Sequence, residues 1–125
     1  MTHWSPEELD AIGNAEELRI AAERPDGTMR TPRIIWVVRV GDELFVRSAH
    51  GDRAVWHQQV KRAMRGHISA GGVEKDVTFE DAAGQLNAEI DAVYWDKYRS
   101  HPAQYITPVA DDESHTTTIR LVPRA

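Results

Sequence analysis

The residues best suited to hold a ligand are arginines, hydroxyl side chains and a glycine in the middle of the chain. Phosphate groups are bound by guanidinium forks, hydroxyls and free backbone amides that converge from different segments. Two short segments supply these groups, and the candidate anion site consists of Thr28, Arg30, Thr31, Arg33, Arg47, Ser48, His50 and Gly51. The alternative is that these arginines are solvated or paired with carboxylates, as many surface arginines are.

Two tryptophans accompany this group. Trp36 and Trp56 could stack on a planar ligand, and we include both among the candidate cofactor-binding residues. An aromatic residue at strand or helix spacing also fits a role in the hydrophobic core, so both interpretations stay open.

The sequence gives little support for a metal site, for covalent hydrolysis or for a nucleotide-binding motif. The six histidines show no spacing typical of a metal site, and the chain has no cysteine, so no metal centre is predicted. No nucleophile elbow, phosphate-binding loop or dinucleotide fingerprint is present. Covalent hydrolysis is therefore not supported, and no catalytic residue is assigned.

The charge distribution favours a small anionic ligand. The net charge is -5, yet residues 28–67 contain eight basic and three acidic residues. A protein that is acidic overall with a basic middle lacks the broad positive field that nucleic-acid binding needs. We therefore expect a small-molecule ligand and no nucleic acid.

Length and composition predict a single globular domain over residues 1–125. The hydrophobic fraction of 41% and the charged fraction of 28% are ordinary for a packed protein. The absence of cysteine favours the cytoplasm. No apolar run approaches the roughly 20 residues that span a bilayer, so no membrane association is expected.

A β-hairpin over residues 34–48 is the clearest structural element. Residues 34–40 are apolar on both faces at their start, which is typical of a central strand. Gly41 and Asp42 predict a two-residue turn. That turn places Val38 opposite Phe45, and it puts Arg47 on the same face as Trp36 and Phe45.

The remaining pattern predicts an α+β fold with a mostly antiparallel sheet. The first helix begins with a capping box at Ser5 and Glu8. We further expect a strand at residues 17–23, a turn at 25–27, a helix at 53–65, a second hairpin around Gly71 and Gly72, a helix at 83–99, a solvated loop at 111–114 and a closing strand at 116–122. Six strands and three flanking helices are best accommodated by a small closed or partly closed barrel, because closure removes exposed strand edges.

Residues 26–38 and 41–48, followed by Gly51 and Trp56, resemble the FMN-binding split-barrel superfamily. Within it the chain is most similar to the bacterial family DUF2255, from Trp4 and Glu8 to the segment 117–124, and more distantly to the deazaflavin-dependent nitroreductases. The order of these motifs along the chain carries the resemblance.

The resemblance implies a six-stranded split barrel, often a homodimer, with FMN or a deazaflavin near the subunit interface. Residues 27–31 stand where deazaflavin relatives meet the cofactor phosphate, and Arg33, Arg47 and Ser48 correspond to phosphate-binding residues of flavin oxidases. An oxidoreductase role follows, in which the cofactor carries the chemistry. The alternative is a non-catalytic domain that holds a small anionic or planar ligand, or one that has lost its cofactor.

Overall fold

The computed structural model describes residues 3–49 and 51–124. Within these ranges seven strands form one antiparallel sheet, in the order β2-β1-β5-β6-β7-β4-β3. The strands are β1 (Leu18–Ala22), β2 (Arg33–Ile35), β3 (Val38–Val40), β4 (Glu43–Val46), β5 (Arg65–Ala70), β6 (Val73–Asp81) and β7 (Ile119–Pro123). The described residues also form five α-helices: α1 (Pro6–Gly13), α2 (Val55–Ala63), α3 (Asn87–Lys97), α4 (Ala103–Ala110) and α5 (Asp112–His115), with a 3-10 turn at Gly51–Arg53.

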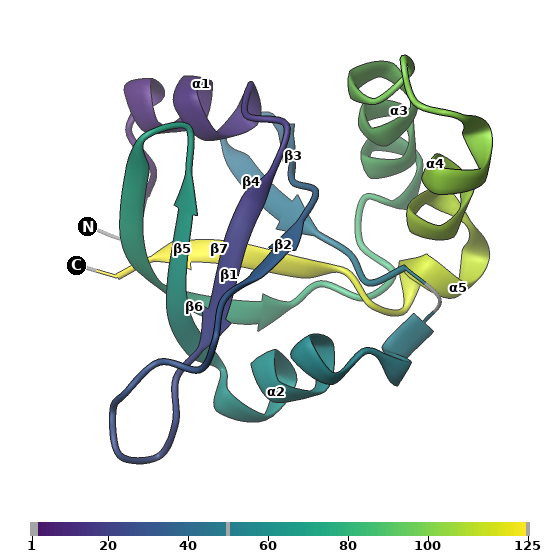
Figure 1. Cartoon of the computed structure of the whole chain (residues 1–125). Helices are drawn as coiled ribbons and strands as arrows, with labels where there is room; N and C mark the ends of the chain where they lie inside the picture. The colour runs from purple at the N-terminus through teal and green to yellow at the C-terminus, as the bar shows by residue number, and fades with distance from the viewer. Residues whose placement is uncertain (1–2, 50, 125) are drawn as a thin grey trace.

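The expected α+β class and antiparallel sheet are confirmed, but the counts of six strands and three helices are wrong. The predicted central strand at residues 34–40 is two strands, which lie at opposite ends of the sheet. Only Trp36 and Val37 separate them, and three residue steps span at most about 11 Å. The two edges of the sheet are therefore close together, and the sheet curls into a half-barrel (Figure 1).

The predicted hairpin register is confirmed where the strands pair. Val38 lies opposite Phe45, and Val40 lies opposite Glu43 across the Gly41–Asp42 turn. Gly41 has a φ of +62°, a conformation that glycine adopts without strain. The second predicted hairpin is also present as β5 and β6, joined at Gly71 and Gly72.

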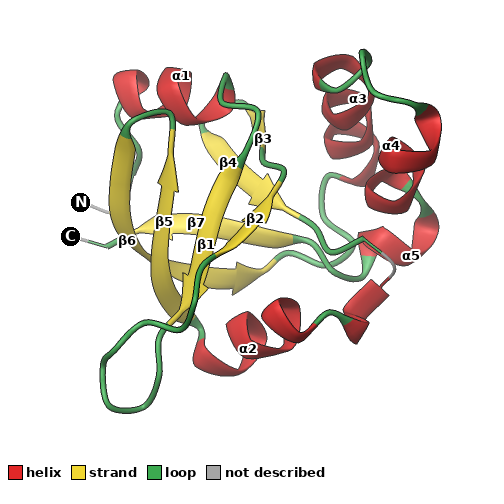
Figure 2. Ribbon diagram, in the orientation of Figure 1, coloured by secondary structure: helices red, strands yellow, loops and turns green. Residues whose placement is uncertain are grey.

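Successive side chains of β4 point to opposite faces of the sheet, and the core is accordingly divided into two clusters. Leu44 and Val46 face the inside of the half-barrel, where Ile20, Ile68 and Leu121 also lie. Phe45 faces the other way, toward α3 and α4. Figure 2 shows the helical layer of α3, α4 and α5 beside the strands. Arg47, which follows β4, therefore lies on the helical side, together with Trp36 and Phe45 as expected.

The sequence missed two helices. α4 contains Pro108, which removes a backbone donor and argues against a helix, and the predicted loop at residues 111–114 is the start of α5. Asp111 caps α5 by accepting a hydrogen bond from the Ser114 amide at 2.8 Å. Within the described ranges no helix has the length and apolar character needed to cross a bilayer.

Candidate functional site

A cavity of about 490 Å³ lies between the sheet edge at β2, the start of α2 and helix α4. We call it the aromatic cavity. Its volume is within the range of small-molecule sites. The side chains that define its character are Ile34, Trp36, Arg47, Trp56, His101 and Tyr105. Three of the predicted site residues, Trp36, Arg47 and Trp56, therefore come together here.

Trp36 is held in place by α3. Its ring stacks on the ring of Tyr98, with 3.8 Å between centroids and an interplanar angle of 5°. The Tyr98 hydroxyl is anchored in turn, because it donates to the carbonyl of Glu16 at 2.6 Å. One face of the indole is thus covered by protein, and Trp36 is both a packing residue and a wall of the aromatic cavity.

Trp56 lies at the first turn of α2. Its exposed fraction is 9%, and it belongs to the core cluster inside the half-barrel while also lining the aromatic cavity. Both tryptophans therefore pack against a core cluster and also line the aromatic cavity. No ligand contact is needed to explain their burial.

Lys97 places a charged group over the stacked rings. Its Nζ donates to the carbonyl of Val37 at 2.6 Å and lies 5.1 Å from the Tyr98 ring centroid. Burial lowers the pKa of Lys97 to about 8. The ammonium group therefore secures the link between β2 and β3 at neutral pH.

Arg47 is fully enclosed, and its charge is balanced inside the protein. Nη1 donates to Oδ1 of Asp91 at 2.5 Å and to the carbonyl of Val109 at 2.9 Å, and Nε donates to Oγ1 of Thr118 at 2.9 Å. His115 contacts the other oxygen of Asp91 at 2.9 Å. The remaining nitrogen, Nη2, is buried and has no hydrogen-bond partner in the described part of the protein.

A second cavity, of about 330 Å³, lies between the turn after β1 and the second half of α2. We call it the arginine cavity. Its charged side chains are Glu23, Arg24, Arg30, Arg62 and Arg65. Four guanidinium groups against one carboxylate make this cavity strongly positive.

The four arginines are not equally available. Arg65 pairs with Glu23 at 2.7 Å, and Arg24 donates to the carbonyl of Met29 at 2.8 Å. Arg30 and Arg62 make no ion pair with any residue in the described ranges. These two guanidinium groups are the ones free to bind an anion. The sequence pointed to Arg30 and missed Arg24, Arg62 and Arg65, although Arg62 and Arg65 belong to the same basic stretch.

Four other predicted site residues lie outside both cavities. Thr28 holds the turn, because its amide and hydroxyl donate to Asp26 at 3.0 and 2.7 Å, and these bonds lower the pKa of the Asp26 carboxyl. Thr31 and Arg33 are exposed. Ser48 is buried and its amide donates to Thr117 at 3.0 Å.

Two further predicted residues belong to the segment that leads into α2. Gly51 has a φ of +78° and opens the 3-10 turn before the helix. His50 lies outside the described residues.

The aromatic and arginine cavities lie along the same side of α2. Trp56 lines the first and Ala63 lines the second. Residues seven positions apart share a helix face, and the rise of 1.5 Å per residue places them about 10 Å apart along the axis. The segment from Arg30 to Trp36 borders both cavities on the opposite side. An aromatic space and a basic space are thus aligned along one helix.

The sequence between residues 8 and 121 matches a family described as uncharacterized proteins conserved in bacteria, DUF2255. The chain belongs to the DUF2255 family. No curated protein matches the sequence.

Several solved structures have a fold similar to that of this chain. A conserved hypothetical protein from Mycobacterium tuberculosis is 15% identical, with a TM-score of 0.62 over 99% of this chain and 82% of its own. An F420 reductase is 14% identical, with a TM-score of 0.56 and coverage of 94% and 93%. A candidate pyridoxamine 5′-phosphate oxidase from Listeria innocua is 12% identical, with a TM-score of 0.61 and coverage of 95% and 92%.

The expected resemblance to DUF2255 is confirmed. At these identities the likeness to the solved structures shows the fold.

Proposed function

We propose that the protein binds a flavin-type or deazaflavin-type cofactor along the side of α2 that carries the two cavities, and that it acts as an oxidoreductase. The observation that carries this proposal is the alignment of the aromatic cavity with the arginine cavity. A planar ring with a phosphate-bearing chain needs an apolar aromatic space followed by a positive one. The shared fold with an F420 reductase and a candidate pyridoxamine 5′-phosphate oxidase supports the same conclusion.

The donor groups in the aromatic cavity fit such a ring. Arg47 lines this cavity, and its Nη2 is a buried donor without an acceptor among the described residues. An unsatisfied buried donor is costly, and the carbonyl oxygens of a flavin or deazaflavin ring are acceptors of the kind it needs. Trp56 and Tyr105 supply apolar walls. Because Asp91 already neutralises Arg47, this donor adds no unbalanced charge to the cavity.

The arginine cavity fits the phosphate. Arg30 and Arg62 would bind it, since their guanidinium groups carry no other anion in the part of the chain described. Arg65 and Arg24, held by Glu23 and Met29, raise the local positive potential. Thr28, Thr31, Arg33, Ser48 and Gly51 stay predictions, and none of these five lines either cavity. His50, outside the described residues, also stays a prediction.

Bound in this way, the cofactor supplies hydride transfer, and the protein supplies position and a dry environment. Trp36 fixes one wall through its stack on Tyr98. Arg47 fixes the ring through a hydrogen bond, and Arg30 and Arg62 fix the phosphate. Because the cofactor supplies the reactive group, the protein needs no conspicuous catalytic motif in its sequence.

We also propose that the functional unit is a homodimer. Ile34 on the edge strand β2 is 53% exposed and Tyr105 on α4 is 57% exposed, and both line the aromatic cavity. Large apolar side chains around a cavity mouth favour coverage by another protein surface. A second copy of the chain placed there would exclude water from the ring.

The alternative is a non-catalytic domain that binds a small anion in the arginine cavity alone. The observation in its favour is that Arg30 and Arg62 line the arginine cavity together and have no ion-pair partner among the described residues. Titration with FMN, with a deazaflavin cofactor and with inorganic phosphate separates the two. Saturable quenching of tryptophan fluorescence by FMN or the deazaflavin supports the cofactor, whereas binding of phosphate alone supports the alternative.

A further inference from the structure

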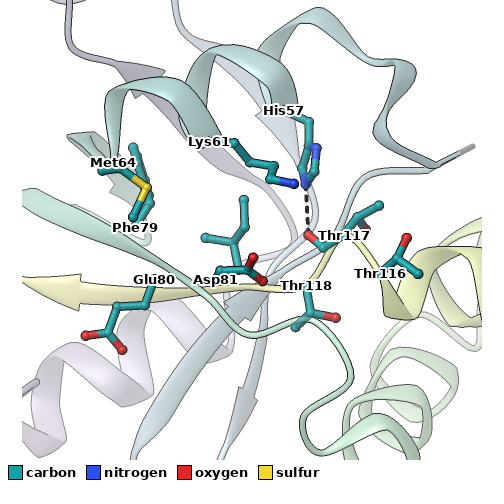
Figure 3. Close-up of a pocket in the computed structure, with 10 residues that line it drawn as sticks. His57, Lys61, Met64, Phe79, Glu80, Asp81, Thr116, Thr117 and Thr118 are labelled. Atoms are coloured by element: carbon teal, nitrogen blue, oxygen red, sulfur yellow. Dashed lines mark hydrogen bonds between the residues drawn. The ribbon is translucent and has the colours of Figure 1, made fainter.

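A third cavity, of about 210 Å³, opens between α2, the end of β6 and the segment that precedes β7. Figure 3 shows the side chains that line it. The ones that matter here are His57, Lys61, Met64, Phe79, Asp81 and Thr118. We call it the small cavity. It is not part of the aromatic or the arginine cavity, and the proposed function does not use it.

The floor of the small cavity is rigid and buried. His57 is 0% exposed, and its Nε2 lies 2.9 Å from the carbonyl oxygen of Thr117. Because a carbonyl only accepts, Nε2 carries the proton. Thr118 is fixed as well, since its hydroxyl accepts a hydrogen bond from Arg47. A site with a preformed floor loses little conformational entropy when a ligand binds.

The rim of the small cavity carries two charges of opposite sign. Lys61 comes from α2 and Asp81 from the end of β6, and both side chains line the same space (Figure 3). Neither makes an ion pair with a residue in the described ranges. Asp81 is nevertheless oriented, because its Oδ1 accepts a hydrogen bond from the Ala83 amide at 2.9 Å. One fixed carboxylate and one free ammonium group are therefore available to a ligand.

The rest of the lining is largely apolar. Phe79 and Ile119 are buried below the rim, and Met64 is 50% exposed beside them. Glu80 also lines the small cavity, but it lies near Arg120, with 3.3 Å between Nη1 and Oε1. The negative charge of Glu80 is therefore balanced by Arg120, which does not line the cavity. The cavity thus presents one positive group, one negative group and an apolar wall.

We propose that the small cavity binds a zwitterionic α-amino acid with an apolar side chain. Lys61 would bind the carboxylate, Asp81 the ammonium group, and Met64, Phe79 and Ile119 the side chain. A simple anion would be repelled by Asp81, and a simple cation by Lys61. The volume is below that of sites for drug-sized ligands, which fits a single amino acid.

The test is an NMR titration of the full chain with L-leucine as the probe. We expect saturable shifts of the amide resonances of Asp81 and of residues 116–118. Isocaproate lacks the ammonium group and isoamylamine lacks the carboxylate, so each should bind at least about tenfold more weakly. Equal affinity for the three compounds, or no saturable shift at these residues, would overturn the proposal.

Variants of the two rim charges extend the test. Lys61→Gln and Asp81→Asn should each weaken leucine binding about tenfold, the loss expected for one charge-assisted hydrogen bond at a partly exposed site. Asp96→Asn is the matched control, because Asp96 is an exposed carboxylate of α3 that contacts Arg99. Unchanged leucine affinity in both rim variants, or an equal loss in the control, would contradict the assignment.

Discussion

Arg47 and Asp91 form a salt bridge that joins the end of the half-barrel sheet to the helical layer. The Nη1 to Oδ1 distance is 2.5 Å, the Arg47 side chain is fully enclosed and that of Asp91 is 25% exposed. His115 of α5 contacts the same carboxylate. One aspartate therefore ties the residue that follows β4 to α3 and α5, and that residue, Arg47, lines the aromatic cavity.

The first prediction concerns the stability of this link. Asp91→Ala leaves Arg47 buried without its counter-charge, and removal of one partner of a buried pair costs about 3 kcal/mol of the free energy of unfolding. Urea denaturation measures the loss. Combining Arg47→Met with Asp91→Leu should recover part of it, because an apolar pair leaves no buried charge.

The control for this prediction is Asp96→Ala. Asp96 pairs with Arg99, and both side chains are exposed, at 81% and 76%. A surface pair of this kind contributes at most about 1 kcal/mol. If Asp91→Ala and Asp96→Ala had the same small effect, the salt bridge would not hold the helical layer in place.

The second prediction is a pH dependence that arises at His67 on β5. Nδ1 of His67 lies 2.9 Å from Oδ1 of Asp76, and Nε2 lies 3.3 Å from Oε1 of Glu74, both on β6. The hydrogen bond to Asp76, with the further contact to Glu74, raises the pKa of His67. A raised pKa means that the folded state holds the proton more tightly than the unfolded chain.

The stabilisation from His67 is therefore complete below about pH 6.5, the ordinary value for histidine, and is lost as the pH rises through the raised pKa. His67→Gln should be less stable than the wild type in acid, and the difference should shrink as the pH increases. Urea denaturation at several pH values measures it. A difference that stays constant with pH would rule out the ion pair as its cause.

The third prediction tests the homodimer. Burial of a large apolar side chain contributes about 1.5 to 3 kcal/mol, so Ile34→Lys on the edge of β2 should raise the dimer dissociation constant at least about tenfold. Sedimentation equilibrium measures this constant. Trp95→Lys is the control, because Trp95 is 41% exposed on α3 and does not line the aromatic cavity. A wild-type monomer at all concentrations would refute the proposal.

Features set by local sequence could be predicted. The capping box is present as expected, with Ser5 and Glu8 bonded reciprocally at 2.9 and 3.1 Å. The glycine-containing turns of both hairpins are also where the sequence put them. Such features depend on a few neighbouring residues, whose conformational preferences are strong enough to decide the structure.

Features that depend on pairing between residues far apart in the sequence could not be predicted. Nothing in residues 34–40 says that the first part pairs with β1 and the last part with β4, because alternation reports burial and not the pairing partner. The same holds for the site. Arg47 pairs with Asp91, 44 positions away, and Arg30 lines the same cavity as Arg62 only because α2 lies beside the turn after β1. The basic segment could be predicted, but its division between two cavities could not.

The most direct test of the central claim compares FMN with riboflavin, which differ only in the phosphate. Tryptophan fluorescence should give tighter binding of FMN, because Arg30 and Arg62 bind the phosphate. Replacing both arginines with alanine should remove this preference, whereas Arg99→Ala on the exposed surface should leave it intact. Riboflavin and FMN binding with equal affinity to the wild type, or an unchanged preference after loss of both arginines, would contradict the account.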